Sequence, residues 1–194
     1  TDSIAAFLAA APLQIGAAVT SLGTTLAVKM LSPARIDAPE IGLYSHKLGE
    51  GWLVGGASNT GGNVLRTLFG DTEVARLSRQ IDPNISSNLD YYPLTKPGER
   101  FPVNDPNYQP RLDPRPADNA TFLHGVFESI ARIEQQCYAE MALRGAGKPA
   151  PLFTAGGGAQ NEVWTAIRSR VLNRPIQIAP HSEAAIGAAV LVMA

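Results

Sequence analysis

The chain has 194 residues, of which 45% are hydrophobic and 17% charged, with 16 Lys and Arg against 17 Asp and Glu. This length and composition predict one large globular domain and exclude a disordered chain. The near-neutral charge, with no stretch that concentrates Lys and Arg, argues against a nucleic-acid partner and an anionic membrane surface. No apolar run reaches the ~20 residues that span a bilayer, and no signal peptide is present, so we expect a soluble cytoplasmic protein.

The first residues predict a helix and a chain that continues upstream. Asp2 or Ser3 can cap a helix over residues 4–11, which Pro12 ends. There is no initiator Met, and no polar leader precedes the apolar pattern. We therefore expect this chain to be one part of a longer protein.

Two strand pairs and two short helices are predicted next. The strands cover residues 19–22 and 26–29, and then 43–48 and 52–55. A stretch of small residues, 55–62, leads into a helix near 63–69, and a second helix covers 72–80.

Residues 82–119 form a proline-rich loop with eight of the fifteen prolines. Its four aromatic residues favour packing on the domain over disorder. Within it, Glu99 and Arg100 either pair, reach a ligand or pack in the loop, and packing is the favoured interpretation.

The last third predicts a long helix and then alternating strands and helices. Apolar residues at three- and four-residue steps, including the only cysteine, Cys137, indicate a helix over 120–144 and a buried thiol. Strands over 151–155 and 176–179 flank a helix over 162–172, and Ser182 caps a final helix over 183–193. This order indicates a parallel sheet covered by helices.

Gly156, Gly157 and Gly158 stand between a predicted strand and a predicted helix. Glycines there let a ligand approach the backbone near free amides, but a tight turn needs them equally. Spacing alone leaves both interpretations open. Three consecutive glycines do not make the dinucleotide fingerprint G-x-G-x-x-G.

Other motifs are weaker. Gly23, Thr24 and Thr25 can hold a phosphate oxygen, although many hairpins carry such a turn without a ligand. Residues 145–149 look like a P-loop but fail, because Pro149 replaces the Ser or Thr that holds magnesium. The three histidines and Cys137 show no metal-ligand spacing, so no protein metal site is expected.

Taken in order, these segments resemble the C-terminal domain of the FGGY carbohydrate kinases. The subgroup that looks most similar comprises the ribulokinase- and xylulokinase-like enzymes of cyanobacteria and plants. The matching stretches are residues 1–7, 21–29, 55–62, 92–102, 156–161 and 184–189. The resemblance covers essentially the whole chain.

The resemblance implies an α/β, actin-like ATPase (ribonuclease H-like) lobe with a mixed sheet flanked by helices. Residues 1–194 would be the ATP-binding C-terminal lobe, with 82–119 as an insertion loop and the N-terminal sugar-binding lobe absent. By position, Asp2 corresponds to the catalytic aspartate. The expected phosphate contacts are Gly23, Thr24 and Thr25, and the expected adenosine contacts are Gly62 (or Gly56), Gly157, Gly158, Ala159 and Asn161.

The implied function is ATP-dependent phosphorylation of a pentulose, D-ribulose or D-xylulose, with Mg²⁺ bridging phosphate oxygens. The implied partners are ATP, a sugar and the missing lobe, without which the chain is expected to be inactive; a homodimer is a further candidate assembly. Two alternatives stay open: a non-catalytic nucleotide-binding or interaction module, and, less favoured, a nicotinamide-dependent oxidoreductase domain.

Overall fold

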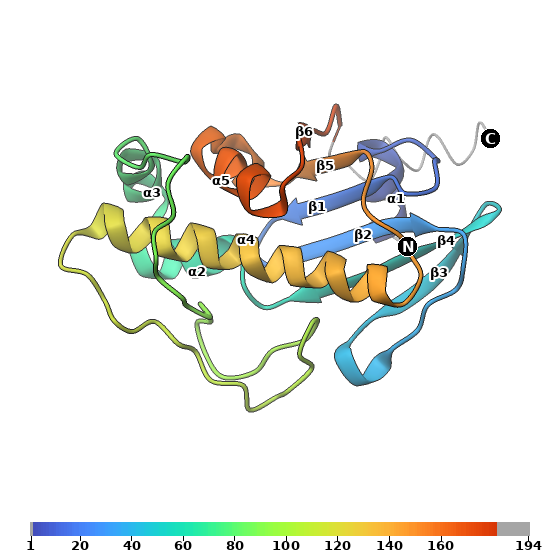
Figure 1. Cartoon of the computed structure of the whole chain (residues 1–194), viewed down its shortest axis with the longest axis horizontal. Helices are drawn as coiled ribbons and strands as arrows, with labels where there is room; N and C mark the ends of the chain where they lie inside the picture. Colours follow the sequence, from blue (N-terminus) through green and yellow to red (C-terminus); the bar gives the residue numbers. More distant parts are fainter. Residues whose placement is uncertain (1, 182–194) are drawn as a thin grey trace.

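The computed structural model describes residues 2–181, with side chains from Ile4 onward, as one six-stranded sheet with helices on both faces (Figure 1). The strands are β1 Ala18–Leu22, β2 Leu26–Ser32, β3 Tyr44–Leu48, β4 Gly51–Ser58, β5 Leu152–Ala155 and β6 Gln177–Ile178. The helices are α1 Asp2–Ala10, α2 Gly62–Phe69, α3 Asp71–Ser78, α4 Asn119–Leu143 and α5 Glu162–Leu172, with 3-10 turns η1 Pro39–Ile41 and η2 Gly157–Gln160. The expected helix over 183–193, with its cap Ser182, lies outside the described residues.

The sheet is mixed, as expected, in the order β3-β4-β2-β1-β5-β6. β1, β2, β4 and β3 pair antiparallel, whereas β5 pairs parallel with both β1 and β6. The parallel arrangement expected for the last two strands is therefore confirmed, and it extends to β1. Because β1 and β5 run in the same direction, with Thr20 opposite Thr154, their carboxyl ends meet at one edge of the sheet.

The prediction that β4 ends at residue 55 was wrong, because this strand continues to Ser58. Gly55, Gly56 and Ala57 stay paired with β2, despite low strand propensity. A side chain on Gly56 would lie 2.6 Å from the ring of Phe101, which packs directly on the strand. The small residues at this end of β4 leave room for Phe101 of the proline-rich loop.

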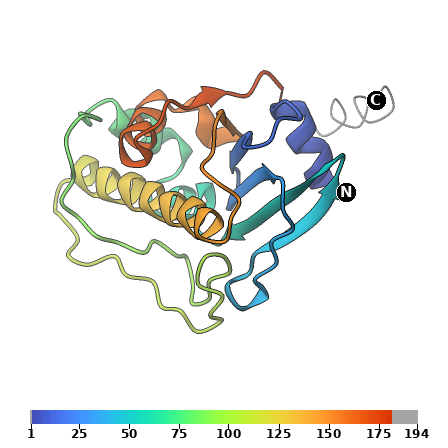
Figure 2. The same cartoon turned by 45° about the vertical axis from the view of Figure 1, so that its right-hand side comes forward.

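Two hydrophobic clusters lie on opposite faces of the sheet. Val28 and Met30 pack on one face with residues of α4, while Leu31, the next residue along β2, packs on the other with Phe7 of α1. The alternation follows from the two-residue period of a strand. Figures 1 and 2 show α4 along one face and α1 on the opposite one. Cys137 is completely buried in α4, as predicted, and burial raises the pKa of its thiol.

The loop over 82–119 is packed, as its aromatic residues predicted. Tyr91, Tyr92 and Phe101 are buried in the cluster with α4. Glu99 is also buried, and its carboxylate accepts hydrogen bonds from Ser58 Oγ (2.6 Å) and Tyr92 OH (2.8 Å). Glu99 thus anchors the loop to the end of β4, which agrees with the packing interpretation.

A buried ion pair joins α4 and α5 to the neighbouring strands β1 and β5. Arg168 of α5 donates from Nε and Nη2 to Glu134 of α4 at 2.7 and 2.8 Å, and both side chains have 0% exposure. Thr20 Oγ1 donates to the same carboxylate at 2.5 Å, and Arg168 Nη1 donates to Thr154 Oγ1 at 2.8 Å. The register partners Thr20 and Thr154 are therefore tied to one fixed pair of charges.

We predict that Arg168→Met lowers the free energy of unfolding by about 3–5 kcal/mol, because it leaves the Glu134 carboxylate buried without its cation. Urea unfolding followed by circular dichroism measures the change. The matched control is Arg76→Met, which breaks the exposed Arg76–Glu73 pair and should cost less than about 1 kcal/mol. Equal costs for the two variants would contradict this role of the buried pair.

Candidate functional site

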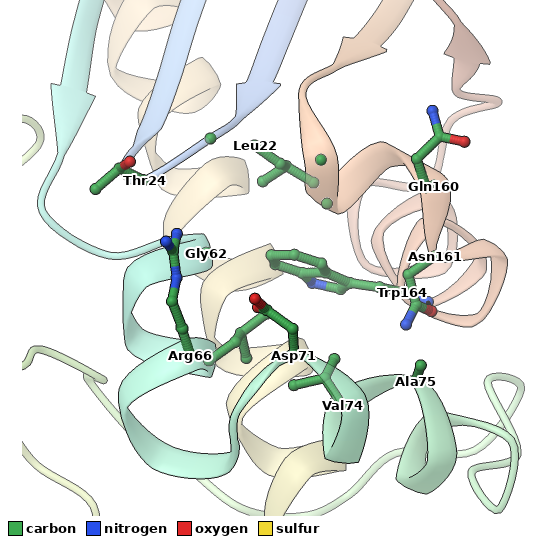
Figure 3. A pocket seen from close by; sticks show the side chains of 14 residues that line it. Leu22, Thr24, Gly62, Arg66, Asp71, Val74, Ala75, Gln160, Asn161 and Trp164 are labelled. Carbon is green, nitrogen blue, oxygen red and sulfur yellow. Dashed lines mark hydrogen bonds between the residues drawn. The ribbon is translucent and has the colours of Figure 1, made fainter.

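A cavity of about 540 Å³ opens at the edge of the sheet where β1 and β5 end. Its walls come from the β1–β2 turn, from η2 and the start of α5, and from α2 and α3 (Figure 3). The lining residues are Leu22, Gly23, Thr24, Gly62, Leu65, Arg66, Asp71, Val74, Ala75, Gly157, Gly158, Gln160, Asn161 and Trp164. Six of the residues expected to contact a nucleotide are among them: Gly23, Thr24, Gly62, Gly157, Gly158 and Asn161.

The Gly23 and Thr24 turn is held by the first residues of α2. The amide of Gly62 donates to Gly23 O at 2.9 Å, and the amide of Asn63 donates to Thr24 O at 3.1 Å. A side chain on Gly62 would lie 2.6 Å from Gly23 O, so only glycine allows this approach. The start of α2 therefore positions the turn, while Gly23 itself borders open space and Thr24 is exposed.

The three glycines after β5 have different roles. Gly156 has a φ of +85°, and a side chain there would lie 2.7 Å from Leu22 O. A side chain on Gly158 would lie 2.6 Å from the ring of Trp164. Gly157 has no such neighbour within 4 Å and is exposed. Close packing therefore requires glycine at positions 156 and 158. At Gly157, the missing side chain only leaves space in the cavity.

Asn161 and Trp164 join the cavity to α5. Asn161 is the N-cap of this helix, and its Oδ1 accepts from the amide of Trp164 at 2.9 Å. The Trp164 indole is 1% exposed, stacks on Phe127 of α4 with 4.9 Å between ring centroids, and donates from Nε1 to Phe127 O. A rigid aromatic floor therefore lies below the glycine turn.

The opposite wall, which sequence reasoning missed, comes from α2 and α3. Arg66, Asp71, Val74 and Ala75 line the cavity, and Figure 3 shows the Arg66 side chain extending toward the Thr24 end. Arg66 stands four residues after Gly62, so helical spacing places both on one side of α2. That spacing was the available signal, but only the tertiary structure brings α3 across from η2.

The other residues expected at the site do not line the cavity. Thr25 does not line the cavity, and Ala159 is buried at 2% exposure within η2. Gly56, the alternative to Gly62, lies in β4 beneath Phe101, so the structure favours Gly62 as the lining glycine. Asp2 is the first residue of α1, and its side chain is outside the described part of the chain.

Across residues 4–181, for which side chains are described, no three His, Cys, Asp or Glu residues are grouped as metal ligands. No helix within residues 2–181 is long and apolar enough to cross a membrane.

Comparison with known proteins now adds to this geometry. The model of the "FGGY family of carbohydrate kinases, C-terminal domain" matches residues 18–194. The chain belongs to the FGGY family. The turn after β5 lacks the dinucleotide fingerprint that the nicotinamide alternative would require.

Solved FGGY-type kinases have the same fold. A xylulose kinase from Brucella ovis has 25% sequence identity and a TM-score of 0.84, over 98% of this chain and 42% of that chain. A xylulose kinase from Rhodospirillum rubrum has 20% sequence identity and a TM-score of 0.82, over 99% of this chain and 41% of that chain. A Plasmodium falciparum glycerol kinase with ADP has 16% sequence identity and a TM-score of 0.75, over 98% of this chain and 40% of that chain. The chain has the actin-like ATPase fold and spans about two fifths of the length of these kinases.

We predict that Gly158→Ala destabilises this FGGY domain by about 1–3 kcal/mol, because the new methyl group overlaps the Trp164 ring and Leu22. Thermal unfolding measures the loss. Gly157→Ala, one residue away with open space around it, is the matched control and should change stability by less than about 0.5 kcal/mol. The reverse order would refute the division of roles within the glycine turn.

Proposed function

We propose that this chain is the ATP-binding C-terminal lobe of a two-lobe kinase that phosphorylates a pentulose, D-xylulose or D-ribulose. One observation carries the proposal: the Gly23–Thr24 turn and the Gly157–Asn161 segment, more than 130 residues apart in sequence, line a single cavity. The sugar-binding lobe would precede residue 1, and its absence would leave this chain inactive alone. The share of the solved kinases that the chain spans supports this organisation.

The cavity suits a nucleotide in volume and in the placement of its polar groups. Its 540 Å³ lies within the range of small-molecule sites. Val74, Ala75 and Trp164 offer apolar contact for an adenine ring at one end. Since Asn161 Oδ1 already caps α5, its Nδ2 is the group that would donate to the adenosine.

The opposite end suits the phosphates. The exposed Thr24 hydroxyl and the backbone of Gly23 lie there, and the Arg66 guanidinium extends toward them (Figure 3). Arg pairs with phosphate oxygens through two parallel hydrogen bonds. A magnesium ion, when bound with ATP, would neutralise phosphate charge, and it usually needs few protein ligands.

The chemistry assigned to Asp2 is that of a general base. The hydroxyl oxygen of the sugar would form a bond to the γ-phosphorus, while the bond from phosphorus to the bridging oxygen of ADP breaks. Asp2 would accept the hydroxyl proton. Its place in the first turn of α1, on the chain segment that would lead to the other lobe, supports a position at the boundary between the lobes.

The pentulose assignment rests on the xylulose kinases among the similar structures and on the resemblance of the sequence motifs. The residues of this lobe support the nucleotide half of the reaction. Choice between D-xylulose and D-ribulose belongs to the sugar-binding lobe.

We predict that Gly157→Leu weakens ADP binding at least tenfold, because its side chain would fill the open space beside the glycine turn. Isothermal titration calorimetry with the chain measures this affinity; a tenfold loss corresponds to about 1.4 kcal/mol. Ala166→Leu, which introduces the same side chain on the exposed side of α5, should leave ADP affinity unchanged. ADP binding by Gly157→Leu at full strength would remove this cavity as the nucleotide site.

In the protein that carries both lobes, Asp2→Asn should lower kcat for pentulose phosphorylation by about 10²–10⁴-fold, because the base is lost. The Kd for ATP should stay within about twofold, since the nucleotide cavity is untouched. Coupled measurement of ADP release gives kcat, and calorimetry gives the Kd. Full turnover by this variant would refute the role of Asp2.

A further inference from the structure

Lys29 lies on the face of the sheet that α1 covers, away from the nucleotide cavity. It alternates with Val28 and Met30, which face α4, and its register partner Val19 packs with α1. There it lines a second cavity, of about 260 Å³, between α1 and the sheet. Lys29 thus places a positive charge beneath the first helix of the chain.

The residues that line this cavity together with Lys29 are small or apolar. Ala6 and Phe7 of α1, Ser21 of β1 and Gly156 line the cavity with it. Opposite Lys29, Gly55 gives the side chain room, since a methyl group there would lie 3.0 Å from Lys29 Cγ. Burial lowers the pKa of Lys29 to about 8, as expected for an ammonium group that has lost part of its water shell.

This cavity adjoins the proposed nucleotide site through the backbone. Ser21 and Gly156 line the Lys29 cavity, while the next residues along the chain, Leu22 and Gly157, line the nucleotide cavity. The two cavities therefore lie on opposite sides of the same strand ends, where β1 and β5 finish. A phosphate chain bound along the Gly23–Thr24 turn would extend from the nucleotide cavity toward the Lys29 cavity.

Helix α1 places the proposed base near the same cavity. Asp2 stands four residues before Ala6, one helical turn along α1. The Lys29 cavity is thus bordered by the helix that carries the proposed base and by the strand ends that carry the proposed phosphate turn. A transferring phosphoryl group has to lie between these two elements.

We propose that Lys29 binds the phosphoryl group that is transferred, either as the terminal phosphate of ATP or as the phosphate of the sugar phosphate product. The inference rests on the proposed kinase function and adds to it a cationic residue from this lobe. A partly dehydrated ammonium group gains more from contact with a phosphate oxygen than a fully solvated one, because less water separates the charges. Lys29 is a binding residue here, and the proton transfer stays with Asp2.

The test compares Lys29→Met and Lys29→Arg in the protein that carries both lobes, with ATP, ADP and a pentulose 5-phosphate as separate probes in calorimetry. Lys29→Met should bind ATP at least tenfold more weakly and ADP within twofold of the original protein, whereas Lys29→Arg should retain most of the ATP affinity. If the loss falls on the pentulose 5-phosphate instead, Lys29 holds the product. Unchanged affinity for both ATP and pentulose phosphate, or equal losses for ATP and ADP, would overturn the proposal.

A pH series separates binding from a merely structural role. A bound phosphate raises the pKa of Lys29, so the ratio of ATP to ADP affinity should fall as the pH rises from 7 to 9, and Lys29→Arg should abolish this fall. Lys29 also lines a neighbouring groove, whose described charged residues are Arg35, Asp37, His46 and Arg100. Residues 4–10 of α1 include no charged side chain. A pH-independent ratio in the original protein would contradict the proposal.

The controls keep this inference separate from the proposed function. Urea unfolding of Lys29→Met shows whether the variant is folded, so that a loss of ATP affinity with ADP affinity retained is assigned to Lys29 and not to unfolding. If the original protein binds neither ATP nor ADP, the proposed function itself fails. If ADP binds normally and Lys29 has no effect on ATP or pentulose phosphate, only the role of Lys29 fails.

Discussion

The parallel pairing of β1 with β5 determines where the candidate site forms. These strands are separated by about 130 residues, and their parallel alignment brings the Gly23–Thr24 turn to the same edge as the turn that begins at Gly156. The fully buried Arg168–Glu134 pair fixes this alignment by bonding to Thr20 and Thr154, the register partners of the two strands. A buried ion pair is weak evidence for stability in itself, but losing one partner is costly, which suits a device that enforces one register.

Glycines around the larger cavity allow close contacts between its walls. Gly62 lets α2 approach the β1–β2 turn, and Gly158 makes room for the Trp164 ring. These contacts set the cavity walls without touching a ligand. Gly157, in contrast, borders open space, so its lack of a side chain matters for what enters the cavity.

The two cavities divide the proposed reaction between the faces of one sheet. The larger one has the aromatic floor and the cap residue Asn161, which suit adenosine, with Arg66 at the phosphate end. The smaller one has Lys29 beneath α1, the helix that begins with Asp2. Consecutive residues at the ends of β1 and β5 line the two cavities: Ser21 and Gly156 the smaller one, and Leu22 and Gly157 the larger one.

Local sequence determined most of the elements. Apolar periodicity located α4 and α5, the turn residues located the first hairpin, and the aromatic residues of 82–119 indicated a packed loop. The ordered motifs indicated the FGGY family, which the match over residues 18–194 confirmed. The resemblance to that family also selected Gly23, Thr24, Gly62, Gly157, Gly158 and Asn161, all of which line the larger cavity.

Only the tertiary structure decided which residues share a cavity. The extension of β4 through Gly55 and Gly56 depends on Phe101, more than 40 residues away, and no local propensity favours it. Ala159 was expected at the adenosine but is buried within η2, while Arg66 and Asp71 enter the cavity because α2 and α3 fold across from α5. Lys29 reads in sequence as an ordinary strand residue. Its position beneath α1 depends on strand register and on the absence of a side chain at Gly55, and both are set by contacts between segments that are distant in the chain.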